Sequence, residues 1–391
     1  MSQVLKDAEA LYERIRGWRR HLHSRPELSG QEQETAGFIA AELRQLGLTP
    51  VERVGGTWGV TATIGDEDEP VVALRADMDA LPMQEETGLE YASRNPGVMH
   101  SCGHDAHMAM LLGAAALLKA REATLECRVK FIFQPQEELP PGGAQPMIAA
   151  GVLKGVRSIL GLHVWSRLPV GTLGVCVGPF MSAVNDFRVI VRGRGGHAAM
   201  PQECVDPIVA AAQMVLGWHA IVSRSVAMTD AAVLSVTKIE AGSATNIIPE
   251  SALLSGTVRA LDGVVHAHVC DRLCAVAEGV ARAHGATVDV EIMPGYPVLI
   301  NDEAVVTHVV ELARRLGWDE QRVRMLPAQG GGEDFAYYTR QVPGAFVFLG
   351  AGSDMEGESF SQHHPRFDID ESILPMGAAL LAQYVIEPYL A

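Results

Sequence analysis

Residues 70–79 read PVVALRADMD, and this stretch decides the interpretation of the fold. Its first part, residues 70–75, is short and almost entirely apolar, which is typical of a strand buried on both faces of a sheet. Similar runs alternate with helical patterns along the chain, the strands at 59–64, 128–134 and 158–164 and the helices at 1–23, 31–46, 106–121 and 144–150. Apolar strands that alternate with helices predict an α/β layer with a mostly parallel sheet.

The stretch 185–293 has a different order of elements. It predicts strands at 187–192, 232–239, 253–260 and 287–292, and helices at 206–223 and 264–284. This βαββαβ order is the ferredoxin-like arrangement and is self-contained enough to be a domain. A strand at 345–349 and a helix after Asp370 then follow. We therefore predict a catalytic metal-binding domain of residues 1–184 and 294–391, interrupted by a smaller inserted domain of residues 185–293.

The composition limits the class of protein. A chain of 391 residues is long enough for two domains, and 48% hydrophobic with 20% charged residues is normal for a globular protein. The formal net charge of −16 argues against a nucleic-acid partner, which requires a basic face. No apolar run reaches the length of a membrane span and the N-terminus has no apolar signal core, so we expect no membrane association and a cytoplasmic location.

The densest polar cluster is HSCGHDAH at 100–107. Cys102 and His104 flank a glycine and can face one metal ion from a turn, and a thiolate with an imidazole favours zinc or a similar borderline metal. Asp105 is interpreted as the N-cap of the next helix, whereas His107 on that helix is either structural or functional. A Cys-Gly-His triplet is a weak signal when it stands alone.

Other candidate groups follow the ends of the predicted strands. Asp77 and Asp79 follow the strand at 70–75, Glu137 and Glu138 follow the strand at 128–134, and His163 ends the strand at 158–164. Sites in open α/β sheets form beyond the carboxyl ends of the strands, so these groups can converge. Each one alone could be a solvated charge, but together they favour a metal site.

Glu137 and Glu138 suggest a division of labour. Adjacent side chains in an extended segment point in different directions, so one carboxylate can bind metal while the other takes a proton from metal-bound water. The alternative is that both glutamates are solvated in the proline-rich loop at 138–143.

Nine motifs carry a resemblance to a known family: HLHSRPEL at 21–28, RADMDALP at 75–82, MHSCGHD at 99–105, QPQEE at 134–138, GLHVW at 161–165, GHAAMP at 196–201, TNIIP at 245–249, GEDFA at 332–336 and HHPRFD at 363–368. In these motifs and their order the chain resembles the M20 metallopeptidases. The amidohydrolase subgroup, which includes hippurate hydrolases, bacterial N-acyl-amino-acid deacylases and plant auxin-conjugate hydrolases, is the most similar. Loops at 139–144 and 328–333 depart from the family pattern, which bears on substrate preference.

The resemblance implies two divalent metal ions per subunit, zinc or manganese before nickel or cobalt. The implied metal ligands are Cys102, His104, Glu138, His163 and His363. His363 fits the family position better than His364 because it lies two residues before Pro365. Glu137 is implied to be the general base on a metal-bridging water, and Asp79 to support the site from behind.

For the inserted domain the resemblance implies a lid and dimerisation module, hence a homodimer or homotetramer. His197 would reach into the neighbouring subunit's site and stabilise the oxyanion; without the resemblance it reads as a turn histidine. Asn246 and Arg259 would hold the substrate's α-carboxylate, which suits a guanidinium. An exposed pair partner in mid-strand is the alternative for Arg259.

The expected reaction is hydrolysis of the amide bond of an N-acyl amino acid, resembling hippurate or an N-acetyl amino acid, to a carboxylic acid and an amino acid. A carboxypeptidase or dipeptidase acting on short peptides is the alternative within the family. Two further alternatives are a nucleophilic Cys102 with His104 or His107 as base, and a binding protein without activity.

Overall fold

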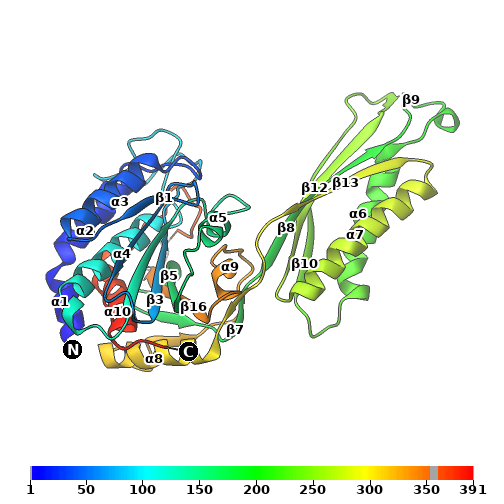
Figure 1. Cartoon of the computed structure of the whole chain (residues 1–391). Helices are drawn as coiled ribbons and strands as arrows, with labels where there is room; N and C mark the ends of the chain where they lie inside the picture. Colours follow the sequence, from blue (N-terminus) through cyan, green and yellow to red (C-terminus); the bar gives the residue numbers. More distant parts are fainter. Residues whose placement is uncertain (1, 353–359, 391) are drawn as a thin grey trace. The chain divides into compact units, whose positions relative to one another are not determined.

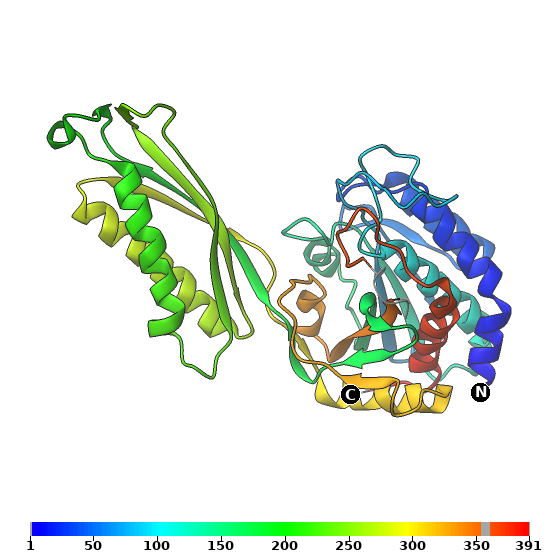
Figure 2. The same ribbon diagram turned by 180° about the vertical axis from the view of Figure 1, so that it is seen from behind.

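The computed structural model describes residues 2–352 and 360–390 of the chain, and Figures 1 and 2 show it from opposite sides. The chain forms two compact units. Unit 1 consists of Met1–Gly178, Ile300–Pro327 and Asp334–Ala391, and unit 2 of Pro179–Leu299 and Ala328–Glu333. Unit 2 thus extends a few residues beyond 185–293 on both sides and includes the glycine-rich segment 328–333.

An eight-stranded sheet forms the centre of unit 1, in the order β1-β2-β4-β3-β5-β16-β6-β15. Its four central strands run parallel to one another: β4 (Arg128–Gln134), β3 (Val71–Asp77), β5 (Val156–Pro169) and β16 (Gly344–Gly352). Every residue of β3 and β16 is buried, which explains the apolar runs in the sequence.

The outer strands of this sheet are mostly antiparallel. β2 (Gly59–Ile64) pairs antiparallel with β4 and with β1 (Val51–Val54), and β6 (Leu173–Val175) pairs antiparallel with β16. Only β15 (Val323–Met325), among the described outer strands, adds a parallel pair, with β6. The predicted α/β layer with a mostly parallel sheet is confirmed.

The helices of unit 1 surround this sheet (Figure 1). They are α1 (Gln3–Ala10), α2 (Tyr12–His23), α3 (Gln33–Gln45), α4 (His104–Lys119), α5 (Ala144–Ala149), α8 (Glu303–Leu316), α9 (Ala336–Thr339) and α10 (Leu374–Ile386), with short 3₁₀ turns at Glu122–Thr124 and Glu371–Ile373. α4 is buried along almost its whole length. The expectation of one helix over 1–23 is wrong in one respect: the amide of Leu11 bonds to the Ala8 carbonyl, one residue short of the α-helical partner, and separates α1 from α2.

Unit 2 contains the elements β8 (Ala183–Arg192), α6 (Pro207–Ser225), β10 (Ala232–Ala241), β12 (Ser251–Ala260), α7 (Gly263–Ala283) and β13 (Thr287–Pro294). Its sheet has the order β10-β12-β8-β13 and is antiparallel throughout. α6 and α7 pack against it through a core that includes Phe187 and Trp218. The predicted ferredoxin-like βαββαβ fold is confirmed.

Four short strands and one turn complete the chain. β9 (Gly196–His197) and β11 (Ile247–Ile248) form a two-stranded ladder in unit 2, near the 3₁₀ turn Pro201–Glu203. β7 (Gly178–Met181) and β14 (Leu299–Asn301) lie where the chain passes between the units. In the part of the chain that the structure describes, no helix combines the length and apolar character of a membrane span.

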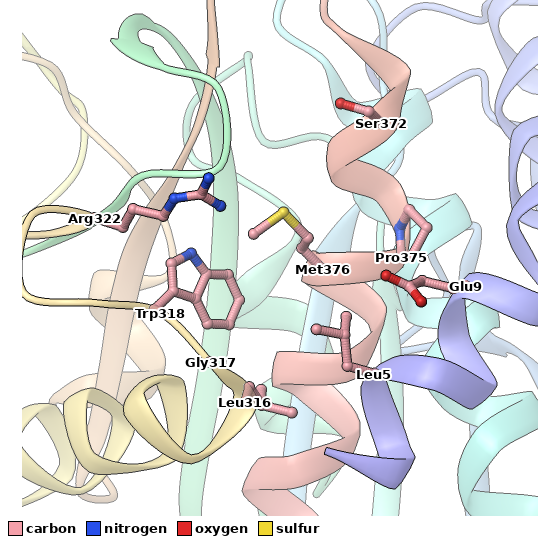
Figure 3. A pocket seen from close by; sticks show the side chains of 9 residues that line it. All are labelled: Leu5, Glu9, Leu316, Gly317, Trp318, Arg322, Ser372, Pro375 and Met376. Atoms are coloured by element: carbon pink, nitrogen blue, oxygen red, sulfur yellow. The ribbon is translucent and has the colours of Figure 1, made fainter. Parts of the chain in front are cut away.

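A cavity of about 390 Å³ opens in unit 1 beside α1, α8 and α10 (Figure 3). Its walls include Leu5, Trp318 and Met376, and Figure 3 shows Arg322 and Glu9 on opposite sides of it. None of its nine lining residues is a predicted site residue, so this cavity is separate from the predicted metal site.

Candidate metal centre

The parallel strands of unit 1 bring the predicted site residues to one edge of the sheet. β3 ends at Asp77, and Asp79 follows two residues later. β4, its parallel neighbour, ends at Gln134 immediately before the loop with Glu137 and Glu138. Because parallel strands share the edge at which their carboxyl ends lie, segments far apart in sequence meet there.

Six side chains converge in one cluster. The Cys102 Sγ lies 3.3 Å from Nε2 of His163, and Nε2 of His363 lies 3.2 Å from Oε1 of Glu138. Three overlapping groups have potential ligand atoms within 4.8 Å of one another: Cys102, His104 and His163; Cys102, Glu138 and His363; and His104, Glu137 and Glu138. The structure thus brings together all five predicted ligands and the predicted base.

The hydrogen bonds of His104 and His163 leave one nitrogen of each ring directed into the cluster. Nδ1 of His104 donates to the backbone carbonyl of Asp79 at 2.8 Å, and Nδ1 of His163 donates to that of Val164 at 2.6 Å. A carbonyl can only accept, so Nε2 of each neutral ring carries a lone pair. Nε2 of His104 is buried and makes no hydrogen bond within the described residues.

The electrostatics of the cluster favour a cation. Burial opposes a charge on His104, but Asp77, Asp79 and Glu138 outweigh it and raise its pKa to about 10. Burial and the carboxylates of Glu138 and Glu137 also raise the pKa of the Cys102 thiol well above its usual range. A divalent cation would take the place of the proton on Nε2 of His104 and favour the thiolate of Cys102. The sulfur, nitrogen and carboxylate donors therefore fit zinc or a similar borderline ion.

The turn of Cys102 and His104 depends on the glycine between them. Gly103 has φ 98° and is the N-cap of α4. A Cβ at this position would lie 2.3 Å from Cγ2 of Val164, so a side chain here is excluded by contact as well as by conformation. The expectation that Asp105 is the N-cap is wrong, because the helix already begins at His104 and Asp105 instead binds Nε of Arg19 at 3.1 Å and Nδ1 of His23 at 2.8 Å.

His107 uses both ring nitrogens in hydrogen bonds to the protein. Its Nε2 accepts from the amide of Val164 at 2.8 Å, and its Nδ1 donates to Asp77 at 2.6 Å. No lone pair is left for a metal ion or for a base. Of its two interpretations, the structural one fits these contacts.

Asp79 fixes the two adjacent glutamates. Its Oδ1 accepts from the amide of Glu137 at 3.0 Å, and its Oδ2 accepts from the amide of Glu138 at 2.9 Å and from the hydroxyl of Ser29 at 2.6 Å. One carboxylate therefore sets the position of both residues. His363 faces this pair, whereas the ring of His364 stacks on Phe360 with 4.3 Å between centroids.

A buried polar network beside Asp77 includes Arg75, Gln134 and Asp334, to which the sequence assigned no role. Nη1 of Arg75 donates to Asp77 at 2.6 Å, and Nη2 donates to Asp334 at 2.8 Å. Asp334 also accepts from Nε2 of Gln134 and from the amide of Ala144, the first residue of α5. An arginine in an otherwise apolar strand was the available signal, since a buried charge requires partners.

In unit 2 the structure brings two of the three predicted residues together. His197 is exposed on β9, its Nδ1 accepts from the amide of Ala199 at 3.0 Å, and the carbonyl of Asn246 accepts from the amide of Ala198 at 3.1 Å. Arg259 lies at the other end of β12, roughly 25 Å along the strand from its start at Ser251. There its Nη1 donates to the carbonyl of Gly330 at 2.6 Å.

Comparison with known proteins identifies relatives over nearly the whole chain. Residues 73–387 match the pattern of peptidase family M20/M25/M40. An N-acetylcysteine deacetylase of Bacillus subtilis is 41% identical over 379 residues, 97% of each chain. Thermostable carboxypeptidase 1 of Saccharolobus solfataricus is 38% identical over 370 residues, 93% of each chain.

The solved structures agree with this relationship. A Bacillus subtilis protein described as a dinuclear metal-binding peptidase of the M20 family superposes with a TM-score of 0.83 at 39% sequence identity. The match covers 97% of this chain and 99% of that protein. The similarity therefore includes both units.

Proposed function

Because this chain belongs to peptidase family M20/M25/M40, we propose that it is a metal-dependent amidohydrolase acting on N-acyl amino acids. Its substrates resemble hippurate or N-acetyl amino acids, and its products are a carboxylic acid and a free amino acid. The observation that carries this proposal is the cluster of five potential ligand side chains near Glu137, of which Cys102, His104 and His163 are buried. The similarity to a deacetylase of an N-acetyl amino acid supports the substrate class.

In this proposal Cys102, His104, Glu138, His163 and His363 hold two divalent metal ions. The thiolate and imidazole donors favour zinc, with manganese, nickel and cobalt as alternatives. When bound, such ions polarise a carbonyl group and lower the pKa of a bound water to about 7.

Glu137 is the proposed general base. Its amide is held by Asp79, and a carboxylate oxygen lies in one 4.8 Å group with ligand atoms of His104 and Glu138. It takes a proton from the attacking water and delivers it to the leaving amine. The same aspartate also holds the amide of Glu138, so the proposed base and a proposed ligand share one support.

His197 is suited to stabilising an oxyanion. Since its Nδ1 accepts from the amide of Ala199, the neutral ring carries its proton on Nε2 and can donate from there. We propose that it serves the neighbouring subunit's site in a homodimer, or in a homotetramer built from such dimers, and that Asn246 and Arg259 hold the substrate carboxylate. A cytoplasmic location stays a prediction.

A carboxypeptidase or dipeptidase is the second candidate, and the similarity to a thermostable carboxypeptidase supports it. Rates on hippurate, N-acetyl amino acids and dipeptides, compared in one preparation, separate the two. A nucleophilic Cys102 is less well supported, because such cysteines need a lowered thiol pKa and the surroundings of Cys102 raise it.

The test is the substitution Glu137→Gln. We expect unchanged metal content and a fall in kcat of about 10²–10⁴-fold, because the amide cannot accept the proton. Elemental analysis and initial rates on an N-acetyl amino acid measure both quantities, with the exposed Glu320→Gln as control.

Chelation provides the companion measurement. Activity should disappear with the metal and return when zinc or manganese is added back. If Glu137→Gln keeps wild-type kcat, the assigned base is wrong. If a thiol alkylator abolishes turnover while chelation does not, Cys102 is the nucleophile.

A further inference from the structure

Three successive backbone amides of the loop that carries Glu137 and Glu138 donate to buried carboxylates. Those of Glu137 and Glu138 bind Asp79, and that of Gln136 binds Oε1 of Glu32 at 2.8 Å. Gln136 also has φ 57°, a left-handed conformation that is uncommon for a residue with a side chain. The residue before the proposed base is therefore held in an unfavourable conformation, and Glu32 binds it there.

Glu32 does not have the role that its place in the fold would ordinarily give it. It is the N-cap of α3, yet its side chain makes no capping hydrogen bond. The carboxylate of Glu27 takes over this role, accepting from the amides of Glu34 at 3.1 Å and Thr35 at 2.8 Å. Glu32 is thereby free to turn back, and its Oε1 accepts from the amide of Gly30 at 2.9 Å as well as from that of Gln136.

The position of Glu32 is unfavourable for stability alone. The residue is fully buried, and its Oε2 makes no hydrogen bond within the described residues. Burial and the nearby carboxylate of Asp79 raise its pKa to about 7. A buried acid with one unpaired oxygen destabilises the folded state, so its presence is better explained by what it holds in place.

We propose that Glu32 is a positioning residue of the metal centre: by accepting from the amide of Gln136 it maintains the left-handed turn that directs Glu137 and Glu138 into the ligand cluster. Together with Asp79 it orients three consecutive peptide groups. The amide group of Gln136 is one residue from the proposed base and two from a proposed ligand. The inference rests on the proposed roles of Glu137 and Glu138.

The experiment compares Glu32→Ala, Glu32→Gln and the exposed control Glu34→Ala in the full-length protein. We expect Glu32→Ala to lower kcat at least tenfold with little change in KM, and to weaken the binding of Zn²⁺ measured by competition with a chromophoric chelator. Glu32→Gln retains an oxygen that can accept from the same amides, so it should keep most of both properties. Glu34→Ala should match the wild type.

A double variant tests the turn itself. Glycine adopts left-handed φ without penalty, so adding Gln136→Gly to Glu32→Ala should restore part of the lost kcat and Zn²⁺ affinity. Wild-type kcat and Zn²⁺ affinity in Glu32→Ala would overturn the proposal. So would equal losses in Glu32→Ala and Glu32→Gln that follow their thermal unfolding temperatures and that Gln136→Gly does not relieve.

The Zn²⁺ titration separates this inference from the proposed function. If the wild type turns over no N-acyl amino acid or peptide, the proposed function fails, and the order of Zn²⁺ affinities among the variants still decides the role of Glu32.

Discussion

Three histidines of unit 1 differ in their hydrogen-bond partners, and therefore in whether a ring nitrogen is available for a metal ion. His104, His107 and His163 lie around the same cluster, with ring centroids 4.5–6.0 Å apart. Nδ1 of His104 and Nδ1 of His163 each donate to a backbone carbonyl, which leaves Nε2 of each ring directed into the cluster. Both ring nitrogens of His107 form hydrogen bonds with protein groups. The hydrogen bonds of each ring therefore distinguish the two proposed ligand histidines from His107.

The raised pKa of Glu32 makes the free energy of unfolding depend on pH. Its ordinary pKa is 4.5, and burial beside Asp79 raises it to about 7 in the folded protein. Between these values the folded state keeps a proton that the unfolded state releases, so the contribution of Glu32 to stability falls as the pH rises through this range. Glu32→Gln removes the ionisation. Relative to wild type it should gain stability between pH 5 and pH 8, by up to about 3 kcal/mol.

Calorimetry of the variant and the wild type at both pH values measures this gain, with the exposed Glu34→Gln as control. A difference between variant and wild type that is the same at pH 5 and pH 8 would contradict the prediction.

Among the elements, α2 is attached to α4 by buried charges as well as by apolar packing. Arg19 and His23 of α2 both bind the carboxylate of Asp105 on α4, and Nε2 of His23 lies 3.2 Å from Glu85. Burial opposes a charge on His23, but Asp105 and Glu85 outweigh it and raise its pKa to about 9. α4 begins at His104, which belongs to the ligand cluster. The bonds from α2 to Asp105 therefore help to fix the position of the neighbouring His104.

The attachment of α2 should weaken at alkaline pH. A histidine whose pKa is raised from 6.5 to about 9 contributes its full stabilisation below pH 6.5 and loses it as the pH rises through 9. The wild type should therefore exceed His23→Gln in thermal stability by more at pH 6 than at pH 9.5. Calorimetry of unit 1 unfolding tests this, with the exposed His219→Gln as reference. Parallel stability curves for wild type and His23→Gln would show that folding does not raise the pKa of His23.

At the level of the whole molecule, the proposed role of His197 requires that one active site uses residues of two subunits. His197 and Asn246 lie at the end of β12 where the strand starts, and Arg259 lies near its other end. A histidine contributed by a partner would allow two inactive variants to complement each other. In a dimer of His197→Ala with Glu137→Gln, one of the two sites has both an intact base and an intact partner histidine.

Mixing the two variants after dissociation and reassociation should restore about a quarter of wild-type activity, since half of the random dimers are mixed and each has one complete site. Mixing each variant with itself is the control. If the mixture stays as inactive as its components while mass analysis shows mixed dimers, His197 acts within its own subunit or not at all.

Much of the architecture is determined by local sequence. The apolar runs of β3 and β16 reflect strands buried on both faces, and the βαββαβ order of unit 2 follows from the periodicity of each segment by itself. The motifs around Cys102, Glu137 and His163 pointed to one sheet edge because parallel strands share it. Such features depend on residues close together in the chain, so they are visible without coordinates.

The tertiary structure alone decided the roles that depend on distant partners. Arg19 and Asp105 are 86 positions apart, and Glu32 and Gln136 are 104 positions apart. Asp105 has the sequence context of a helix cap and Glu32 occupies the cap position of α3, but folding gives each a buried partner from another element. The five proposed ligand residues around Cys102-Gly103-His104 and the supporting Asp79 could be named from the sequence, whereas the contact of Glu32 with Gln136 could not, because no local pattern records which amide a buried oxygen will meet.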